Sequence, residues 1–220
     1  YLPRDFSNAE SLPVVFCFHG GDGYAESMMR FTADFRPLAD QHKFIAVYPQ
    51  GLVFGGKGGS ATNWNYKGPY DNGIDEIAFV ESMIESVTSD YSGDHRRVFA
   101  CGFSQGGNLM WDYASLLGDR FAAVASVAAS MWQWTYDDFT PIEKIGVLTI
   151  HGTNDFYNPY TGNQYSISMD RLNRYWVEIN GSEETASSSQ YARGVTQYVW
   201  QGTEDCHSVE HFRVQGGLHD

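Results

Sequence analysis

The sequence has few basic residues: 14 Lys and Arg stand against 27 Asp and Glu, giving a formal net charge of −13. Because nucleic acids and anionic membrane surfaces repel an acidic protein, this balance argues against both as partners. The chain also lacks any apolar run near the roughly 20 residues that a transmembrane helix needs. No signal peptide is visible, since Tyr1 to Pro3 resemble the interior of a sequence, and we expect a trimmed or mature form.

Cysteine is scarce as well, with three residues in the chain. An odd number cannot be fully paired within one chain. Cys17 and Cys101 each lie in an apolar run typical of a buried strand, so we expect them to be small buried side chains with free thiols. Cys206 lies in a polar stretch. Cysteine usage therefore does not decide the redox compartment in which the protein works.

What the chain does have is a regular alternation of strand-like and helix-like segments within 220 residues, a length that fits one domain. Short apolar runs, typical of strands buried on both faces, occupy residues 14–18, 44–48, 97–101, 122–129 and 147–150, and two more predicted strands occupy 195–200 and 209–214. Helices are predicted at 75–91, with Asp75 as N-cap, and at 105–117 and 169–179. This order predicts a single α/β domain with a mostly parallel, doubly wound sheet in three layers.

Three segments are predicted to be loops: 51–73, 132–141 and the polar, mobile 182–189. The stretch between the predicted strands at 122–129 and 147–150 is too short to hold an inserted cap domain. Long loops on a rigid sheet are where substrate contacts usually lie. We therefore expect an open cleft rather than a lidded one.

A nucleophile motif stands between a predicted strand and a predicted helix. Gly102-Phe103-Ser104-Gln105-Gly106 fits the pattern G-x-S-x-G, in which glycines let strand and helix approach while the turn exposes the serine hydroxyl. The position also places Ser104 at a helix N-terminus, which favours developing negative charge. The plainer alternative is a glycine-rich turn with an incidental serine. The N–H of Gln105 and that of Gly21, in the His-Gly-Gly loop after the first strand, would form the oxyanion hole.

The acid and base follow the serine in the order expected of an α/β-hydrolase. Asp155 comes just after the predicted strand at 147–150, where it would point to the same rim as Ser104. Its rivals, Asp137 and Asp138, lie in an acidic stretch more typical of solvated side chains. His219 follows the last predicted strand and would take the Ser104 proton, with Asp155 holding its other nitrogen.

A second motif, His207-Ser-Val-Glu210-His211, spells a metalloprotease pattern, H-x-x-E-H. That site needs a helix, whereas the apolar alternation here predicts a strand on which Glu210 would point away from both histidines. We therefore predict no metal. His19 and His151 are expected to brace loops or line the pocket, and His42 and His95 to lie at the surface.

Aromatic residues are frequent in the loops expected at the active rim, and such rings can stack on a cinnamoyl group or a sugar face, or contact a polyester chain. The alternative is that some of them only pack the loops against the core. The predicted substrate contacts are Trp64, Trp132, Phe156 and Tyr157, with Trp132 and Phe156 favoured because each closely follows a strand.

An ordered set of motifs resembles the secreted esterase family of polyhydroxybutyrate depolymerase-like enzymes, feruloyl esterases and acetyl xylan esterases. The motifs are His19-Gly20-Gly21, Tyr48-Pro49-Gln50-Gly51, Trp64-Asn65, the helix start at 75–79, Gly102 to Gly107, His151 to Asp155 with Pro159-Tyr160, and Gly216 to His219. The resemblance implies an α/β-hydrolase fold over residues 1–220 and a secreted carboxylic-ester hydrolase without cofactor. It carries the roles above onto Ser104, Asp155, His219, Gly21 and Gln105.

Family members usually continue past the histidine with a Trp-Pro turn and a helix, so the chain is expected to be truncated at both ends. Some members carry a cysteine where this chain has Ser182, which leaves Cys206 without a partner. The expected partner is an ester substrate, and the polymeric candidates are a feruloyl or acetyl ester of a plant polysaccharide and a hydroxyalkanoate polyester. We expect a monomer. Two alternatives stay open: a non-catalytic carbohydrate-binding protein on a hydrolase scaffold, and a serine peptidase of the same fold.

Overall fold

The computed structural model describes residues 1–53, 61–66, 72–203 and 207–220. Cys206 and much of the predicted loop at 51–73 lie outside the described residues. An eight-stranded sheet, in the order β2-β1-β5-β6-β7-β10-β9-β8, forms the centre of the molecule. Its strands are β1 (Leu12–Phe18), β2 (Ile45–Val47), β5 (Gly93–Phe103), β6 (Ala123–Val127), β7 (Gly146–Gly152), β8 (Ser187–Ala192), β9 (Val195–Trp200) and β10 (Val209–Val214).

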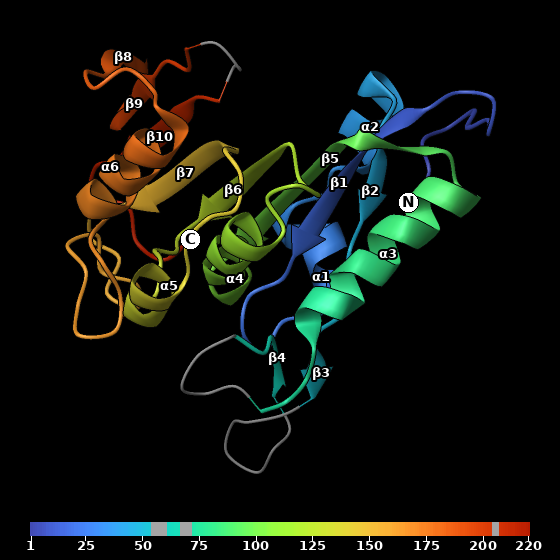
Figure 1. Cartoon of the computed structure of the whole chain (residues 1–220), viewed down its shortest axis with the longest axis horizontal. Coiled ribbons are helices and arrows are strands. Elements are labelled where there is room, and N and C mark those ends of the chain that lie inside the picture. Colours follow the sequence, from blue (N-terminus) through green and yellow to red (C-terminus); the bar gives the residue numbers. More distant parts are fainter. Residues whose placement is uncertain (54–60, 67–71, 204–206) are drawn as a thin grey trace.

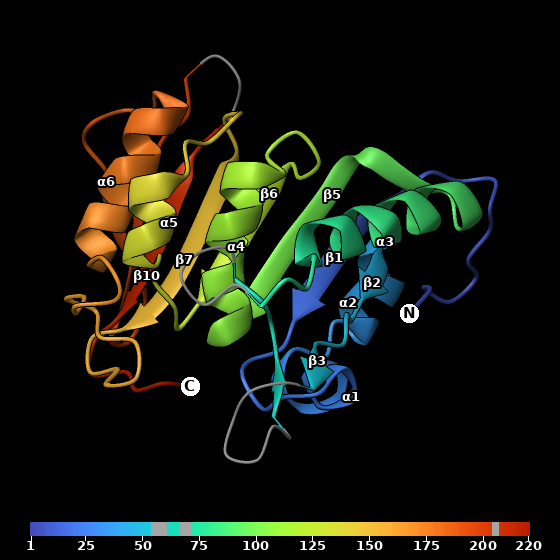
Figure 2. The same ribbon diagram turned by 60° about the horizontal axis from the view of Figure 1, so that its bottom comes forward.

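The sheet is parallel from β2 to β10 and ends in two antiparallel strands, β9 and β8. This confirms the predicted mostly parallel sheet. Because the parallel strands share one direction, their carboxyl ends meet at one edge. Figure 2 shows the arrowheads of β1 and β7 pointing to the same edge, where the C-terminal segment also lies. The loops after β1, β5, β7 and β10 are therefore brought together, and these loops carry the predicted catalytic residues.

Four helices, α3 (Glu76–Asp90), α4 (Gln105–Leu116), α5 (Gln133–Asp138) and α6 (Met169–Asn180), cover one face of the sheet (Figure 1). The shorter α1 (Ala25–Ser27), the π-helical η1 (Met28–Thr32) and α2 (Arg36–His42) lie near β1 and β2. A small hairpin is formed by β3 (Leu52–Val53) and β4 (Thr62–Asn63). The predicted N-cap of α3 is confirmed, since the Asp75 carboxylate accepts a hydrogen bond from the Ala78 N–H.

Helix α4 is buried along nearly its whole length, and this fixes the serine at its N-terminus. Trp111 and Tyr113 are fully buried. Trp111 packs against Trp176 of α6 with ring centres 6.1 Å apart, and Tyr113 lies 5.2 Å from Phe18 of β1. Large aromatic side chains bury much apolar area and leave little room for movement. The helix is therefore held from two sides.

All three predicted loops contain regular structure, and the strands β3 and β4 already described lie within the predicted loop 51–73. Residues 133–138 of the predicted loop 132–141 form α5, whose Thr135 hydroxyl donates to the buried Asp112 of α4. Residues 187–189 of the predicted mobile loop belong to β8, which pairs with β9 through a turn containing Gly194 at φ 77°. The strand was missed because it is an exposed edge strand, so none of its side chains shows the apolar alternation that predicts strands.

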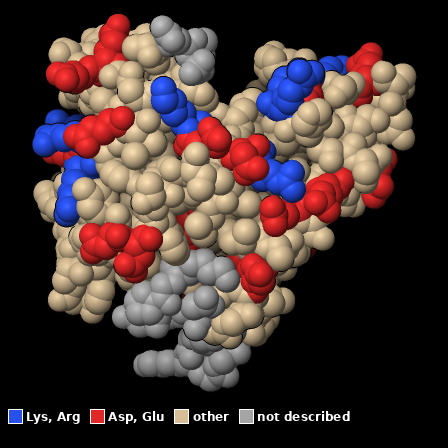
Figure 3. Space-filling model, viewed as in Figure 1, with Lys and Arg blue, Asp and Glu red and all other residues tan. Residues whose placement is uncertain are grey.

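Cys17 is buried, as predicted, whereas Cys101 is half-buried. Cys17 and Cys101 are free thiols on neighbouring strands, with their Sγ atoms 3.6 Å apart. On the described part of the face in Figure 3, basic and acidic side chains are interspersed and no continuous basic patch forms. No helix among the described residues is long and apolar enough to cross a membrane.

Candidate active site

Ser104 lies on a strained turn between β5 and α4. Its backbone has φ 52° and ψ −118°, an unfavourable conformation for a residue with a Cβ atom. The turn is possible because glycines flank it: a Cβ on Gly102 would lie 2.1 Å from the Gly106 carbonyl oxygen, and one on Gly106 would lie 2.4 Å from the Phe18 carbonyl oxygen. The Ser104 N–H donates to the Val127 carbonyl at 2.9 Å. The predicted strand–turn–helix context of the G-x-S-x-G motif is confirmed.

A line of two short hydrogen bonds joins Ser104, His219 and Asp155. The Nε2 atom of His219 lies 2.8 Å from the Ser104 Oγ, and its Nδ1 atom lies 2.7 Å from the Asp155 Oδ2. Because a carboxylate only accepts, Nδ1 carries the imidazole proton and Nε2 is left to accept from the serine hydroxyl. The structure thus brings together the three residues that the sequence predicts for the triad, in the geometry that activates a serine.

The Asp155 carboxylate is oriented by its own loop. It is 4% exposed, and its Oδ1 atom accepts hydrogen bonds from the backbone N–H groups of Tyr157 and Asn158, each at 2.9 Å. The Asn158 side chain donates in turn to the Ala128 carbonyl. These donors occupy Oδ1 and leave Oδ2 for His219. The rivals Asp137 and Asp138 lie on α5, where Asp137 accepts from Gln133, and neither contacts His219.

His151 supports the loop that carries Asp155, as predicted for a bracing residue. Its Nε2 donates to the Asn158 carbonyl at 2.7 Å and lies 3.6 Å from the Asp155 Oδ2. Burial lowers the pKa of His151, so the ring is neutral at pH 7. A neutral ring beside the triad adds no positive charge that would compete with His219 for the carboxylate.

The segment that carries His219 is tied to the same loop. The Asn154 N–H donates to the Gly217 carbonyl, and the Gly216 N–H donates to the Thr153 hydroxyl. The imidazole lies between Phe103 and Tyr157, with ring centres 5.3 and 5.2 Å away. The base is therefore positioned by backbone hydrogen bonds on one side and by aromatic contacts on the other.

The predicted oxyanion donors lie next to the serine. Gln105 is the first residue of α4, so its N–H has no intrahelical acceptor. Its carbonyl accepts from the Tyr66 hydroxyl, and its side chain accepts from the Trp64 N–H. A Cβ on Gly21 would lie 3.4 Å from the Gln105 side-chain oxygen, so the two loops touch. Two backbone N–H groups beside a serine are the arrangement that stabilises an oxyanion.

His19 holds the Gly21 loop in place, as the sequence predicts for a bracing residue. Its Nδ1 donates to the Gly20 carbonyl at 2.7 Å, and its Nε2 accepts from the Gly51 N–H at 3.0 Å. Burial lowers the pKa of His19, which keeps the ring in the neutral form that these two contacts require.

These groups line a cavity of about 530 Å³ that holds Ser104, Gln105, Gly21 and His219. Trp132 and Tyr157, two of the four predicted substrate contacts, also line it. Tyr66, another aromatic residue of the loops expected at the rim, lines it too, together with Asp22, Asn108 and Asn158, which were not predicted. Asn108 and Asn158 carry no sequence signal of their own, because they reach the cavity only through the packing of α4 and the acid loop.

The other two predicted contact residues lie differently. Phe156 is 69% exposed and packs against Tyr157 with ring centres 4.6 Å apart and the rings tilted by 32°, at the outer rim rather than in the cavity lining. Trp64 is 1% exposed and donates from its indole nitrogen to the His19 carbonyl. It is mainly a packing residue, although it borders an adjoining cavity of about 370 Å³ with Trp132, Trp134 and Tyr165. Trp132 and Trp134 stack at 4.9 Å there.

The histidines of the H-x-x-E-H pattern lie away from Ser104. His207 precedes β10, and His211 lies within it, buried against Thr149 and Tyr160. The predicted strand is confirmed, and Glu210 on the opposite face bonds Gln197. Among the described residues no three His, Cys, Asp or Glu side chains gather as a metal site would require.

Comparison with known proteins points to ester hydrolysis. Residues 1–151 match the family described as "Putative esterase". The bifunctional acetylxylan esterase/xylanase XynS20E of Neocallimastix patriciarum is 23% identical over 222 residues, which cover all of this chain and 30% of that protein. The "Probable feruloyl esterase C" of Aspergillus clavatus is 28% identical over 219 residues, covering all of this chain and 74% of the relative. Poly(3-hydroxyalkanoate) depolymerase C of Paucimonas lemoignei is 27% identical, covering 94% of this chain and 54% of the relative.

The chain thus spans less than two thirds of the length of two of these three relatives. Among solved structures, the acetyl xylan esterase from Aspergillus awamori superposes with a TM-score of 0.72 at 15% identity, covering all of this chain and 87% of that one. Esterase PE8 superposes with a TM-score of 0.64 at 16% identity, covering all of this chain and 89% of that one. These likenesses, with the sheet order above, confirm the predicted α/β-hydrolase fold.

Proposed function

This chain belongs to the esterase family that its first 151 residues match, and from that premise we propose that it is a serine carboxylic-ester hydrolase. Ser104 is the nucleophile, His219 the general base and Asp155 the acid. The observation that carries the proposal is the hydrogen-bonded line from Asp155 through His219 to Ser104, with contacts of 2.7 and 2.8 Å. It ends at the N-terminus of α4, where backbone N–H groups favour negative charge.

In the first half of the reaction the Ser104 Oγ attacks the ester carbonyl carbon while His219 Nε2 takes the hydroxyl proton. The carbonyl oxygen becomes an oxyanion facing the N–H groups of Gly21 and Gln105. Asp155 stabilises the imidazolium through Nδ1. When the tetrahedral intermediate collapses, the C–O bond to the alcohol breaks, and the imidazolium gives its proton to the departing alkoxide. The acyl group stays on Ser104.

In the second half a water molecule takes the place of the alcohol. His219 removes one of its protons as the water oxygen attacks the acyl carbon, and the same two N–H groups face the second oxyanion. Collapse breaks the bond to the Ser104 Oγ, which recovers a proton from the imidazolium. The products are a carboxylic acid and the free enzyme.

The substrates we propose are acyl esters of plant polysaccharides, feruloyl or acetyl, or hydroxyalkanoate polyesters. Relatives named for each of these chemistries support this range. The open, aromatic-lined cavity around Ser104 and the adjoining one at Trp132 offer room for a ring or a chain. Because such polymers cannot enter a cell intact, we propose that the enzyme acts outside the cytoplasm. We also propose that it acts as a monomer.

The test is a hydrolysis panel at neutral pH with p-nitrophenyl acetate, p-nitrophenyl butyrate, methyl ferulate and a hydroxybutyrate oligomer. The wild type is compared with Ser104→Ala and with Ser89→Ala, which removes an exposed hydroxyl on α3 as a matched control. We expect turnover to disappear in Ser104→Ala and to persist in the control, and the preferred ester separates the plant-wall from the polyester substrate. Ester turnover that survives in Ser104→Ala would overturn the assignment of Ser104 as the nucleophile.

A further inference from the structure

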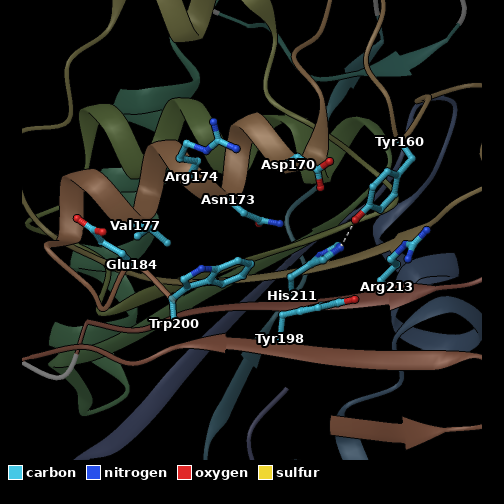
Figure 4. A pocket seen from close by; sticks show the side chains of 10 residues that line it. All are labelled: Tyr160, Asp170, Asn173, Arg174, Val177, Glu184, Tyr198, Trp200, His211 and Arg213. Carbon is cyan, nitrogen blue, oxygen red and sulfur yellow. Dashed lines mark hydrogen bonds between the residues drawn. The ribbon is translucent and has the colours of Figure 1, made fainter. Parts of the chain in front are cut away.

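A second cavity of about 510 Å³ lies between α6 and the strands β9 and β10, and it shares no lining residue with the cavity around Ser104. Figure 4 shows that α6 forms one wall and the two strands form the other. Its lining residues are Tyr160, Asp170, Asn173, Arg174, Val177, Glu184, Tyr198, Trp200, His211 and Arg213. The ester-cleaving mechanism uses none of these side chains.

Aromatic rings form the strand side of this cavity. Tyr198 and Trp200 occupy alternate positions of β9 and therefore project from the same face of the sheet. Their ring centres are 6.3 Å apart at an interplanar angle of 27°, and the Tyr198 ring lies 6.2 Å from His211 at 20°. The successive rings are thus close to parallel, and together they offer apolar faces along the wall.

The wall is fixed by a buried hydrogen-bonded chain. His211 is 2% exposed, its Nδ1 lies 2.8 Å from the Thr149 Oγ1, and its Nε2 lies 2.8 Å from the Tyr160 hydroxyl oxygen. Burial lowers the pKa of His211 to about 4, so the ring is neutral at pH 7. A neutral ring can donate from Nδ1 to Thr149 and accept the Tyr160 proton at Nε2. The cavity is therefore preformed, not assembled from loose surface side chains.

Polar groups with free hydrogen-bonding capacity face these rings. Among the described residues, the side chains of Arg174, Arg213, Asp170 and Glu184 form no ion pair and no hydrogen bond, although Arg213 lies 5.8 Å from the Tyr160 ring centre. Two positive and two negative groups balance each other, so the cavity favours neither an anion nor a cation. Forked guanidinium and carboxylate groups instead suit a neutral ligand rich in hydroxyl groups.

We propose that this cavity is a non-catalytic binding site for a neutral pyranose oligosaccharide. A pyranose ring presents an apolar face of C–H groups that packs on aromatic rings, and its equatorial hydroxyls pair with guanidinium, carboxylate and amide groups. Tyr198 and Trp200 would take the ring faces, and Arg174 and Asp170 the hydroxyls. The site goes beyond the proposed function, because it would hold a sugar chain without cleaving any bond.

The test measures sugar binding by isothermal titration calorimetry, using the full chain with xylohexaose, cellohexaose, maltohexaose and an oligogalacturonate. Trp200→Ala removes one aromatic face, and Arg174→Ala removes an exposed polar group, which keeps the test sound if the first variant folds poorly. Tyr191→Ala is the matched control, since Tyr191 is a 68% exposed aromatic of β8 that packs on Phe212, on the other face of the sheet.

We expect at least one neutral hexaose to bind, with affinity at least tenfold weaker in Trp200→Ala, several-fold weaker in Arg174→Ala and unchanged in Tyr191→Ala. Hydrolysis of p-nitrophenyl acetate should be the same in all four proteins. No binding of any neutral hexaose, binding unaffected by both cavity variants, or binding of the oligogalacturonate alone would overturn the proposal. Sugar binding without ester turnover would instead remove the proposed function and leave this site standing.

Discussion

The orientation of the Asp155 carboxylate makes a sharp prediction for Asp155→Asn. Two backbone N–H groups, from Tyr157 and Asn158, point at Oδ1. An asparagine must turn its carbonyl oxygen toward them, because its amide nitrogen cannot accept a hydrogen bond. The side-chain NH₂ is then directed at His219 Nδ1, where the carboxylate oxygen lies 2.7 Å away in the wild type.

This reversal changes the proton on the base. Facing an N–H donor, His219 Nδ1 must become the acceptor, so the proton moves to Nε2 and points at the Ser104 Oγ, 2.8 Å away. Nε2 can then no longer accept the serine proton. The corresponding change in a serine protease lowers kcat roughly 10⁴-fold, and we expect a loss of the same order here, about 5 kcal/mol of transition-state stabilisation. Stability should change little, because every hydrogen bond of the loop keeps a partner.

The assay is steady-state hydrolysis of p-nitrophenyl acetate between pH 6 and 9, with urea denaturation of each protein alongside. Asp138→Asn is the matched control, since it makes the same change on α5, away from His219. It should retain wild-type kcat. If Asp155→Asn kept more than a tenth of the wild-type kcat while folded, the tautomer argument and the assignment of the acid would both be refuted.

Three further predictions follow from the same geometry. The pKa of His211 falls from 6.5 to about 4 on folding, which corresponds to about 3 kcal/mol of stability that is present above pH 6.5 and lost as the pH falls toward 4. Urea denaturation across pH 4–8 should therefore show that the free energy of unfolding falls less steeply with decreasing pH in His211→Asn than in the wild type. An equally steep fall in both proteins would contradict this prediction. Gly106→Ala should destabilise by about 1–3 kcal/mol or more, because its Cβ would lie 2.4 Å from the Phe18 carbonyl oxygen; the midpoint of chemical denaturation measures this. Trp132→Ala should raise KM for methyl ferulate more than for p-nitrophenyl acetate, because the feruloyl group carries an aromatic ring that can contact the aromatic wall around Trp132, whereas the acetyl group carries none. Equal changes for both esters would count against that wall as a contact for the acyl group.

The sequence was most informative where a short motif follows a buried strand. The elbow around Ser104 and the Asp155 loop both stand directly after apolar runs, and parallel strands bring their ends to one edge whatever the loops do. The base was harder to select, because three histidines follow the acid. The alternating pattern around His211 predicts that it lies within a strand and not in a loop at the rim, and the structure shows it buried in β10.

What the sequence could not predict depends on contacts between distant segments. The edge strand β8 is polar and gains its structure from pairing with β9. Phe156 and Trp64 both lie in loop segments rich in aromatic residues, so the sequence does not distinguish them. Phe156 is nevertheless 69% exposed and Trp64 1% exposed, a difference set by tertiary packing alone. The cavity under α6 draws residues from three elements and two loops, and no single motif in the sequence brings them together.

The segment that runs from β7 through the loop before α6 links the two sites. Within a dozen residues it carries Thr149, which contacts His211, then Asp155, and then Tyr160, whose hydroxyl also contacts His211. A change at the sugar cavity that displaced Tyr160 would therefore pull on the loop that orients the acid. Trp200 lies at the far end of that cavity and makes no hydrogen bond to this segment, so its removal should spare hydrolysis of small esters. If Trp200→Ala lost hydrolysis of the polymer but kept hydrolysis of small esters, the loss would reflect weaker binding of the polysaccharide and not damage to the triad.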